Sequence, residues 1–365
     1  IIMNICIIGD GLTSLSLAKN LINKKINVYF YHKNKIKNFS SNRTIGISKN
    51  NLEFFREEIY KIRKKLFWGI KKIEIYSEKL NKEKLFKFEN GKDSLFYMVK
   101  NDELYASLMS EMSKNKYFKK KIIKDNFSYD KLKKKYNLII NCDPNSFLSK
   151  KFFIKKISKN YNNLAYTTII KHEKIKNNIA TQIFTKIGPL AFLPISNKET
   201  SVVYSIETKA KKYIDSEVLD IICKNNPKYK IQKILKLSRF KLILSNLRNY
   251  HHQNILAFGD LLHRIHPLAG QGFNMTIRDI KILSKIIQNK IDLGMELDSS
   301  ILSDFEKETK IKNFLFSKSI DFIYEVFNFD KKIKSKSFNK ILKIIGKNKD
   351  LTNYFIKYAD EGLNF

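Results

Sequence analysis

Short apolar runs alternate along the chain with stretches of helical spacing, and this alternation predicts an α/β protein. Residues 5–8 (ICII) and 254–258 (NILAF) resemble buried strands of an α/β sheet, and each run is followed by a glycine. Helical spacing follows the first run, and it returns from Phe273, with Ile277 and Leu283 on one face. The pattern therefore predicts two strand–loop–helix units.

Other segments alternate apolar and polar side chains, as strands with one buried face do. Residues 71–77 (KKIEIYS) and 201–206 (SVVYSI) show this alternation, and we expect them in a mixed or antiparallel sheet. From about Ile301 the apolar spacing is helical, and it includes residues 341–345. We expect these last helices to pack on the sheet edge, with a membrane contact as the alternative.

The loop after the second apolar run suits a large polar ligand. Asp260 follows Gly259 at the carboxyl end of the predicted strand, where ligands bind in open α/β sheets, and its carboxylate can accept hydrogen bonds from sugar-type hydroxyls. Gly270 and Gly272 carry no side-chain bulk, so backbone amides can approach a ligand there. The helix that begins near Phe273 would point its positive dipole end at the same place.

A second loop, after the first apolar run, has the spacing of a dinucleotide-binding turn, G-x-G-x-x-G. Gly9 would form the tight turn and Gly11 would let the backbone approach a pyrophosphate. Ser14 stands in place of the third glycine, and it is small enough to keep the helix close to the strand.

Residues 259–279 (GDLLHRIHPLAGQGFNMTIRD) carry a resemblance to a known family. They are similar to the second flavin-binding motif of the class A flavoprotein aromatic hydroxylases, in particular the ubiquinone-biosynthesis branch. The resemblance implies bound FAD, with Asp260 on the ribityl chain, Gly9 and Gly11 on the pyrophosphate, and the backbone of residues 270–274 on the pyrimidine edge of the flavin. The cofactor-binding residues it implies are Gly9, Gly11, Ser14, Arg43, Asp143, Gly259, Asp260, Pro267, Gly270, Gln271, Gly272, Phe273 and Asn274.

Further segments match the same branch in the same order. Arg43 in NRTIGIS resembles an arginine that lies near the flavin, and residues 188–194 (GPLAFLP) resemble a flavin-facing turn and strand of the substrate domain. Asp143 matches a segment linked to flavin and to reduced nicotinamide, but asparagine and proline replace its two glycines. His32 also stands where the family has an acidic residue for the adenosine ribose. We therefore expect weaker contacts to adenosine and nicotinamide than to the flavin ring.

Composition limits the alternatives. The chain has 365 residues, 43% of them hydrophobic, which is enough for one large core or two moderate ones. Its net charge is +35, but the lysines are spread along the whole chain and no nucleic-acid module is recognisable. We attribute the charge to compositional bias and expect no nucleic-acid partner, with attraction to an anionic membrane as a secondary consequence.

The cysteines and histidines do not indicate a metal site. The three cysteines are far apart and form no C-x-x-C pair, so we expect reduced thiols in a cytoplasmic protein. His263 and His266 are three positions apart, but no third ligand is near in the sequence. No apolar run approaches the roughly 18 residues needed to span a bilayer, and no signal peptide is evident.

The resemblance implies an FAD-dependent monooxygenase that hydroxylates the ring of a polyprenylated phenol in ubiquinone biosynthesis. The flavin would be reduced by NADPH or NADH and would react with O2 through a C4a-hydroperoxide, so no catalytic side chain is expected. Expected partners are the phenol, O2, and a membrane or biosynthetic complex at the inner face of the membrane. We expect an FAD domain in residues 1–70, 97–150 and 247–300, a substrate sheet in 71–96 and 151–246, and a helical region in 301–365.

Two other functions stay open. One is a flavin-fold binding or assembly component with weakened or lost turnover, which the replacements at His32, Asn141 and Pro144 favour. The other is a related FAD-dependent reductase or halogenase. A halogenase would need a lysine and a tryptophan motif between flavin and substrate, and the single Trp68 lies in no such context.

Overall fold

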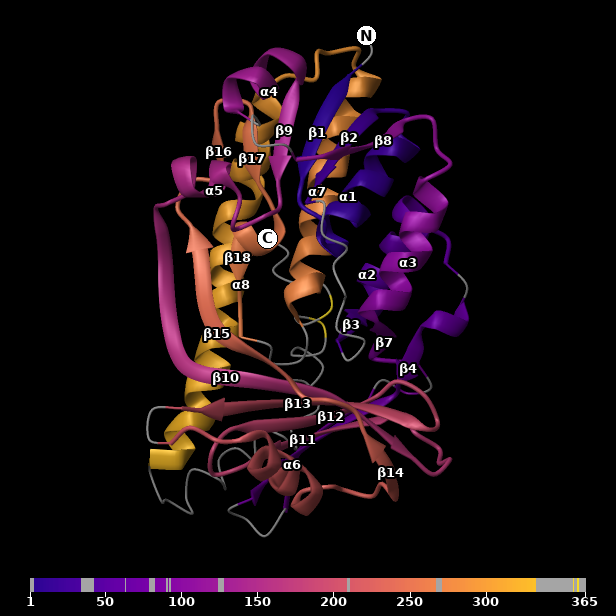
Figure 1. Cartoon of the computed structure of the whole chain (residues 1–365), viewed down its shortest axis with the longest axis vertical. Helices are drawn as coiled ribbons and strands as arrows, with labels where there is room; N and C mark the ends of the chain where they lie inside the picture. Colours follow the sequence, from indigo (N-terminus) through magenta and orange to yellow (C-terminus); the bar gives the residue numbers. More distant parts are fainter. Residues whose placement is uncertain are drawn as a thin grey trace.

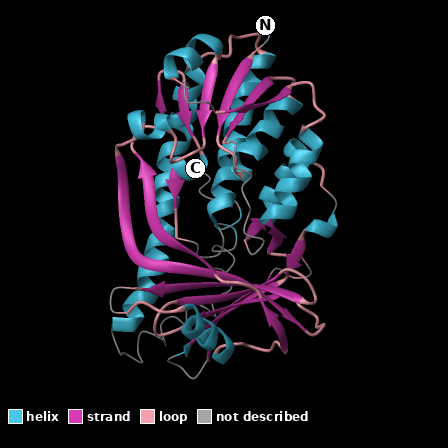
Figure 2. Ribbon diagram, viewed as in Figure 1, coloured by secondary structure: helices cyan, strands magenta, loops and turns pink. Residues whose placement is uncertain are grey.

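The computed structural model describes residues 3–33, 43–62, 64–78, 83–89, 91, 93–123, 128–208, 211–266, 271–332, 357 and 360. Within these residues the strands form two large sheets at opposite ends of the molecule and a small sheet between them (Figures 1 and 2). The predicted α/β fold with a mixed second sheet is therefore confirmed.

One large sheet contains six strands in the described part of the chain, and it is parallel except at one edge pair. The strands, in spatial order, are β16 (His251–His252), β17 (Ile255–Ala257), β9 (Leu138–Asn141), β1 (Asn4–Ile8), β2 (Asn27–His32) and β8 (Phe118–Ile122). The side chains of residues 5–8 in β1 are fully buried, as expected for a central parallel strand covered on both faces.

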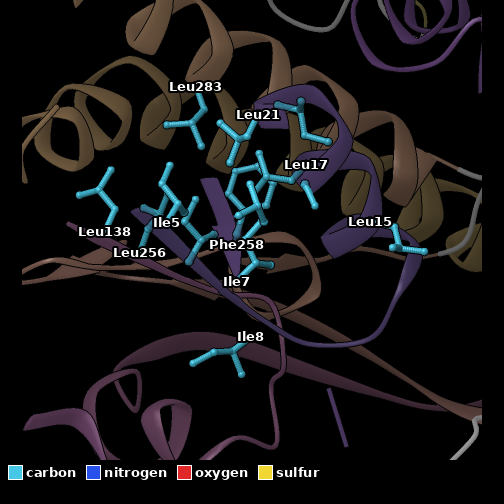
Figure 3. Packing of buried hydrophobic residues seen from close by; sticks show 14 of the residues in the cluster. Ile5, Ile7, Ile8, Leu15, Leu17, Leu21, Leu138, Leu256, Phe258 and Leu283 are labelled. Carbon is cyan, nitrogen blue, oxygen red and sulfur yellow. The ribbon is translucent and has the colours of Figure 1, made fainter. Parts of the chain in front are cut away.

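Two helices pack on this sheet and form the main core with it. They are α1 (Leu12–Asn23) and α7 (Gln271–Asp292). Figure 3 shows Leu21 and Leu283 from these helices near Ile5 of β1 and Phe258, which directly follows β17. Each such buried aliphatic side chain contributes about 1.5–3 kcal/mol to folding, so this packing fixes how both helices meet the sheet edge.

Shorter helices surround the same sheet. Helix α3 packs against α1, while α4 and α5 precede and follow β9. Their bounds are α3 (Asn101–Met112), α4 (Tyr129–Lys135) and α5 (Phe147–Phe152).

The second large sheet has nine strands among the described residues and is mixed. Its path is β18 (His263–Arg264), β15 (Ser238–Leu247), β10 (Lys156–His172), β13 (Glu199–Glu207), β12 (Pro189–Pro194), β11 (Ile179–Phe184), β5 (Lys72–Ser77) and β6 (Glu83–Glu89), with β14 (Ile231–Ile234) also paired to β10. Both segments predicted from their alternation lie in it, as β5 and as part of β13. The pair β5–β11 is parallel, while the other pairs are antiparallel. Helix α6 (Asp215–Lys224) buries Val218 and Ile222 against this sheet.

A small antiparallel sheet joins the two. It consists of β3 (Thr44–Ser48), β7 (Phe96–Lys100) and β4 (Trp68–Ile70). Strand β3 leads directly into α2 (Lys49–Phe54) and the π-helical turn η1 (Phe55–Ile59), and the 3-10 turn η2 (Lys64–Leu66) comes before β4. The Thr44 hydroxyl donates to Ser201 Oγ at 2.7 Å, and Lys100 Nζ lies 2.9 Å from Glu199 Oε2. Both contacts reach β13, so the small sheet connects to the nine-stranded sheet.

The last described helix is α8 (Ser300–Lys332), which runs along the molecule past both large sheets (Figure 1). Its first turns join the main core through Ile301 and Phe305, and a later part packs on β10 and β15 through Phe316 and Ile320. The predicted helical spacing at 341–345 lies outside the described residues. No helix in the described ranges has both the length and the hydropathy needed to cross a bilayer.

Candidate functional site

Three loops meet at the carboxyl edge of the parallel sheet. Strands β17, β9 and β1 are direct neighbours with parallel registers. Their carboxyl ends lead into Gly259 and Asp260, into Cys142 and Asp143, and into Gly9. The structure therefore brings together three segments that the sequence separates by more than a hundred residues.

Gly9 forms the tight turn after β1, and its neighbours leave no room for a side chain. Its φ is +128°, and a Cβ there would lie 2.9 Å from Ser14 Oγ and 3.3 Å from Cys142 Cβ. The backbone N–H of Gly9 donates to Tyr31 O at 3.0 Å. Ser14 thus packs directly on the turn, as expected for a small residue at the third position of the motif.

Gly11 differs from Gly9, because a Cβ at Gly11 would meet no atom of the protein within 4 Å. Gly11 is the N-cap of α1; no side chain caps this helix, and its first turn contains no acidic residue. The first amides of a helix need partners and attract anions. Open space beside an uncapped helix start is the geometry that a pyrophosphate requires.

Gly259 joins the second motif to the first. Its φ is +62°, and a Cβ there would lie 2.5 Å from Cγ2 of Thr13 in α1. Asp260 follows in the short 3-10 turn η4 (Gly259–Leu261), and its side chain is exposed. The close contact between Gly259 and Thr13 places the turn that carries Asp260 next to the start of α1.

The pKa of the Cys142 thiol depends on its burial and on the charges at this edge. Desolvation of this half-buried side chain raises its pKa to about 12, and the carboxylates of Asp143 and Asp260 add to the increase while a hydrogen bond with Ser14 opposes it. A thiol with this pKa stays protonated at neutral pH and is a poor nucleophile. Cys142 therefore acts here as a packing residue between two carboxylates.

Asp143 is already paired within the protein. Lys33 Nζ lies 3.0 Å from its Oδ2, and the backbone N–H of Asn145 donates to its Oδ1 at 2.8 Å. Lys33 follows His32, so a cation stands one position after the place where the resemblance has a carboxylate. The pairing explains how Asp143 is kept in place, and it could not be read from the sequence.

Asn141 has a structural role that the sequence did not reveal. Its side chain is fully buried; Nδ2 donates to the hydroxyls of Ser146 and Ser149 at 2.8 Å each, and Oδ1 accepts from the backbone N–H of Asp143 at 3.2 Å. Asn141, which stands where the resemblance has a glycine, thus connects the end of β9 to the start of α5 through buried hydrogen bonds.

The first turn of α7 holds the described part of the second motif. Gln271 is 6% exposed, and its Oε1 has no hydrogen-bond partner within the described part of the chain. At Gly272, a Cβ would meet no atom within 4 Å, and Phe273 is half-buried. The helix begins two residues earlier than predicted from Phe273, while Pro267 and Gly270 lie outside the described residues.

Asn274 faces the small sheet. Its Oδ1 accepts from the backbone N–H of Ser48 at 2.9 Å and from Asn51 Nδ2 at 3.2 Å, and its Nδ2 donates to Gly46 O at 3.1 Å. These bonds attach the start of α7 to β3 and α2. Because these bonds engage the side-chain amide of Asn274, its backbone is the part that can contact a ligand.

The histidines of the motif contact other protein groups. His263 Nε2 lies 2.6 Å from Asp279 Oδ2, and Asn313 Nδ2 donates to Asp279 Oδ1 at 2.9 Å, with all three side chains buried. His266 stacks on Tyr324 with ring centroids 4.2 Å apart, and its Nε2 lies 3.3 Å from Ser205 Oγ. The described residues include no cluster of three or more potential metal ligands.

Arg43 lies just before β3 with an exposed side chain. Its backbone carbonyl accepts from the N–H of Asn101 at 3.0 Å, which holds this end of β3 against the start of α3.

The described features of this edge fit an FAD molecule. Open space at Gly11 and the uncapped start of α1 suit its pyrophosphate, and the exposed Asp260 suits a polyol chain. The unpartnered Gln271 Oε1 at the start of α7 is an acceptor that a ligand N–H can satisfy.

A glycine turn on a parallel sheet, joined to a large mixed sheet, is the fold of the FAD-dependent monooxygenases of p-hydroxybenzoate-hydroxylase type. The crystal structure of p-nitrophenol 4-monooxygenase from Pseudomonas putida DLL-E4 superposes with a TM-score of 0.78 at 11% identity, covering 100% of this chain and 99% of that one. A probable FAD-dependent monooxygenase of Pseudomonas aeruginosa gives a TM-score of 0.69 at 12% identity, covering 93% of this chain and 99% of that one.

The sequence places the chain more narrowly. The model of the squalene epoxidase family matches residues 135–343, more than half of the chain, and the chain belongs to this family. This match includes β9, the GD segment and α7.

Curated relatives match this chain over only part of their length. The ubiquinone biosynthesis monooxygenase COQ6 of Danio rerio is 22% identical over 306 residues, which cover 67% of this chain and 63% of that protein. The 3-demethoxyubiquinol 3-hydroxylase of Escherichia coli K12 is 28% identical over 153 residues, or 40% of this chain and 39% of that protein. The chain thus spans less than two thirds of the length of these two relatives.

Proposed function

We propose that the protein is an FAD-dependent monooxygenase that hydroxylates the aromatic ring of a polyprenylated phenol in ubiquinone biosynthesis. The observation that carries the proposal is the convergence of Gly11 and Asp260 at one sheet edge, with α7 packed against the turn that carries Asp260, in a member of the squalene epoxidase family. The names of the matched relatives support the substrate class.

In this proposal the protein binds and orients the cofactor. Gly9 and Ser14 shape the turn, and the amides at Gly11 and the start of α1 bind the pyrophosphate. Asp260 accepts hydrogen bonds from the ribityl hydroxyls, next to Gly259. The set of cofactor-binding residues that we propose stays the predicted one: Gly9, Gly11, Ser14, Arg43, Asp143, Gly259, Asp260, Pro267, Gly270, Gln271, Gly272, Phe273 and Asn274.

Bound FAD, reduced by NADPH or NADH, would supply the oxygen chemistry, and the chain would supply charge stabilisation. The amides of the first turn of α7 lie at the positive end of a 22-residue helix, where a negative charge on the ligand is favoured. No acidic residue lies in that first turn to compete for them. Stabilisation of negative charge on the bound ligand is therefore the contribution in which the protein's own electrostatics matter most.

We propose that the two large sheets correspond to the two predicted domains. The cofactor domain would comprise residues 1–70, 97–150 and 247–300, and the substrate domain residues 71–96 and 151–246, with residues 301–365 as the helical region. The division is supported by the strand pairing, since β1, β2, β8, β9 and β17 pair in parallel within the first set of ranges. Strand β18, in the range 247–300, is an exception because it pairs with β15 of the other sheet.

We also propose a peripheral contact with an anionic membrane, which suits an apolar substrate. On the outward face of α8, Ile311 and Phe322 are each 68% exposed, and Lys307 and Lys318 lie on the same face. Flotation with anionic and neutral vesicles tests this proposal. Equal recovery with both kinds, or none with either, would argue against it.

A second function is favoured by one specific contact. Lys33 forms an ion pair with the carboxylate of Asp143, which lies in the segment that the resemblance links to nicotinamide. A flavin-fold binding component with little or no turnover would tolerate this pairing.

Oxygen consumption and product formation separate the two functions. A strain that lacks its own ubiquinone hydroxylase should regain a hydroxylated quinone precursor when it expresses this chain. Flavin binding without oxygen consumption or product, under conditions where a known hydroxylase works, would favour the binding component.

A further inference from the structure

The corner between β3 and α2 lacks a local helix cap. Ser48 is the N-cap of α2, but its side chain makes no capping hydrogen bond, and the first turn contains no acidic residue. The first amides of a helix need acceptors from elsewhere when the N-cap side chain does not provide one. Ser48 Oγ is engaged instead as the acceptor for Asn51 Nδ2, at 2.8 Å.

Asp360 provides the missing acceptor. Its Oδ1 accepts from the backbone N–H of Asn50 at 3.0 Å, across a separation of 310 residues in the sequence. Its backbone carbonyl accepts from Ser48 Oγ at 3.3 Å. Two different groups of Asp360 therefore bind two residues at the start of α2, its N-cap Ser48 and Asn50 in its first turn, which is more specific than a single surface contact.

The same corner is bonded to the start of α7. Ser48 and Asn51 both donate to Asn274 Oδ1, at 2.9 and 3.2 Å, and Asn274 donates back to Gly46 O. Ser48, Asn51 and Asn274 are 4%, 5% and 2% exposed. Buried polar networks of this kind are rigid when every member is satisfied, so a change at one end is transmitted to the other.

We infer that Asp360 is a positioning residue for the flavin site: its carboxylate caps α2 and, through Ser48, Asn51 and Asn274, holds the first turn of α7 in place. The inference rests on the proposed function, because that turn is where we place the flavin ring. Asp360 lies outside residues 135–343, which the family model matches.

The chemistry of the contact predicts how substitutions differ. Asp360→Ala removes the acceptor for the Asn50 amide and leaves the backbone contact to Ser48. Asp360→Asn keeps a side-chain oxygen that can accept the same hydrogen bond. Lys357→Ala is the matched control, since Lys357 is an exposed residue three positions away.

The test uses the full chain and two readouts that do not depend on turnover. FAD affinity is measured by fluorescence titration, and amide hydrogen exchange is followed at residues 48–51 and 271–275. Asp360→Ala should raise the Kd for FAD by up to about fivefold, the size of a lost helix cap, and should speed exchange in both segments. Asp360→Asn should stay within about twofold of the parent chain, and Lys357→Ala should not differ from it.

The outcomes are distinguishable. If the parent chain does not bind FAD at all, the proposed function is wrong. If the parent binds FAD and Asp360→Ala binds it equally well with unchanged exchange at 271–275, the positioning role is wrong. Failure of Asp360→Asn to restore affinity would also overturn the capping geometry, and this variant keeps the test decisive if Asp360→Ala does not fold.

Discussion

Gly259→Ala tests whether the two motif segments are packed against each other as described. The backbone φ of +62° costs an alanine about 1–2 kcal/mol. The new Cβ would also lie 2.5 Å from Thr13 Cγ2, and such overpacking costs about 1–3 kcal/mol. The free energy of unfolding should therefore fall by about 2–5 kcal/mol.

Urea denaturation of the variants measures this loss, and a second substitution separates the backbone contribution from the overpacking contribution. Thr13→Ser removes the colliding methyl group, so the double variant should regain the overpacking part, about 1–3 kcal/mol, and keep the backbone part. Gly272→Ala is the control, because a Cβ there meets no atom within 4 Å and the residue lies in a helix. A Gly259→Ala protein as stable as the parent, or no recovery with Thr13→Ser, would refute the contact between the two loops.

Four further predictions concern the site and the core. Gly11→Ala should change the free energy of unfolding by no more than about 1 kcal/mol, because the space is open, yet raise the FAD Kd at least about tenfold; an unchanged Kd would place the pyrophosphate elsewhere. Asp260→Ala should weaken FAD binding about 10- to 100-fold without loss of stability, since the side chain is exposed; full flavin occupancy after purification would contradict its role. Asp279→Ala should cost at least about 2 kcal/mol in urea denaturation, because it leaves His263 Nε2 and a buried amide without their acceptor; an unaltered midpoint would contradict the buried pair. Burial raises the pKa of Tyr229 to about 12, so the folded state holds the phenol proton more tightly than the unfolded state, and this contribution, at most about 3 kcal/mol, is present below pH 10 and lost between pH 10 and 12. Tyr229→Phe should flatten that decline in an alkaline titration of stability, and an equally steep decline would show that other groups cause it.

The sheet edge could be predicted because its strands have a strong local pattern. The runs at 5–8 and 254–258 are apolar throughout, and a glycine with positive φ follows each one. Parallel strands place their carboxyl ends at one edge, so the position of Gly9 and Gly259 at the same sheet edge follows from the pattern once the sheet is assumed.

The side-chain pairings could not be predicted, because they join residues with no local signal. Nothing near Asp143 in the sequence indicates that Lys33 will pair with it, and nothing near Asn50 indicates Asp360. In the sequence Asn141 stands where the resemblance has a glycine, whereas in the structure its amide donates to the hydroxyls of Ser146 and Ser149. Long-range polar contacts of this kind depend on the tertiary fold, which periodicity does not encode.

The motif histidines show the same limit. Their spacing is compatible with a metal site, but the sequence does not favour one because no third ligand is near. The structure instead pairs His263 with Asp279, which belongs to the same motif 16 residues later, and stacks His266 on Tyr324 of α8. These contacts attach the end of β18 to α7 and the following residue His266 to α8.

The most direct test of the central claim is the absorbance spectrum of the purified full chain, before and after addition of excess FAD and removal of free cofactor. We expect the visible bands of a bound flavin near one equivalent per chain, with occupancy reduced by Asp260→Ala and by Gly11→Ala. A chain that stays colourless after incubation with excess FAD, while folded by circular dichroism, would contradict the flavin site and with it the proposed monooxygenase.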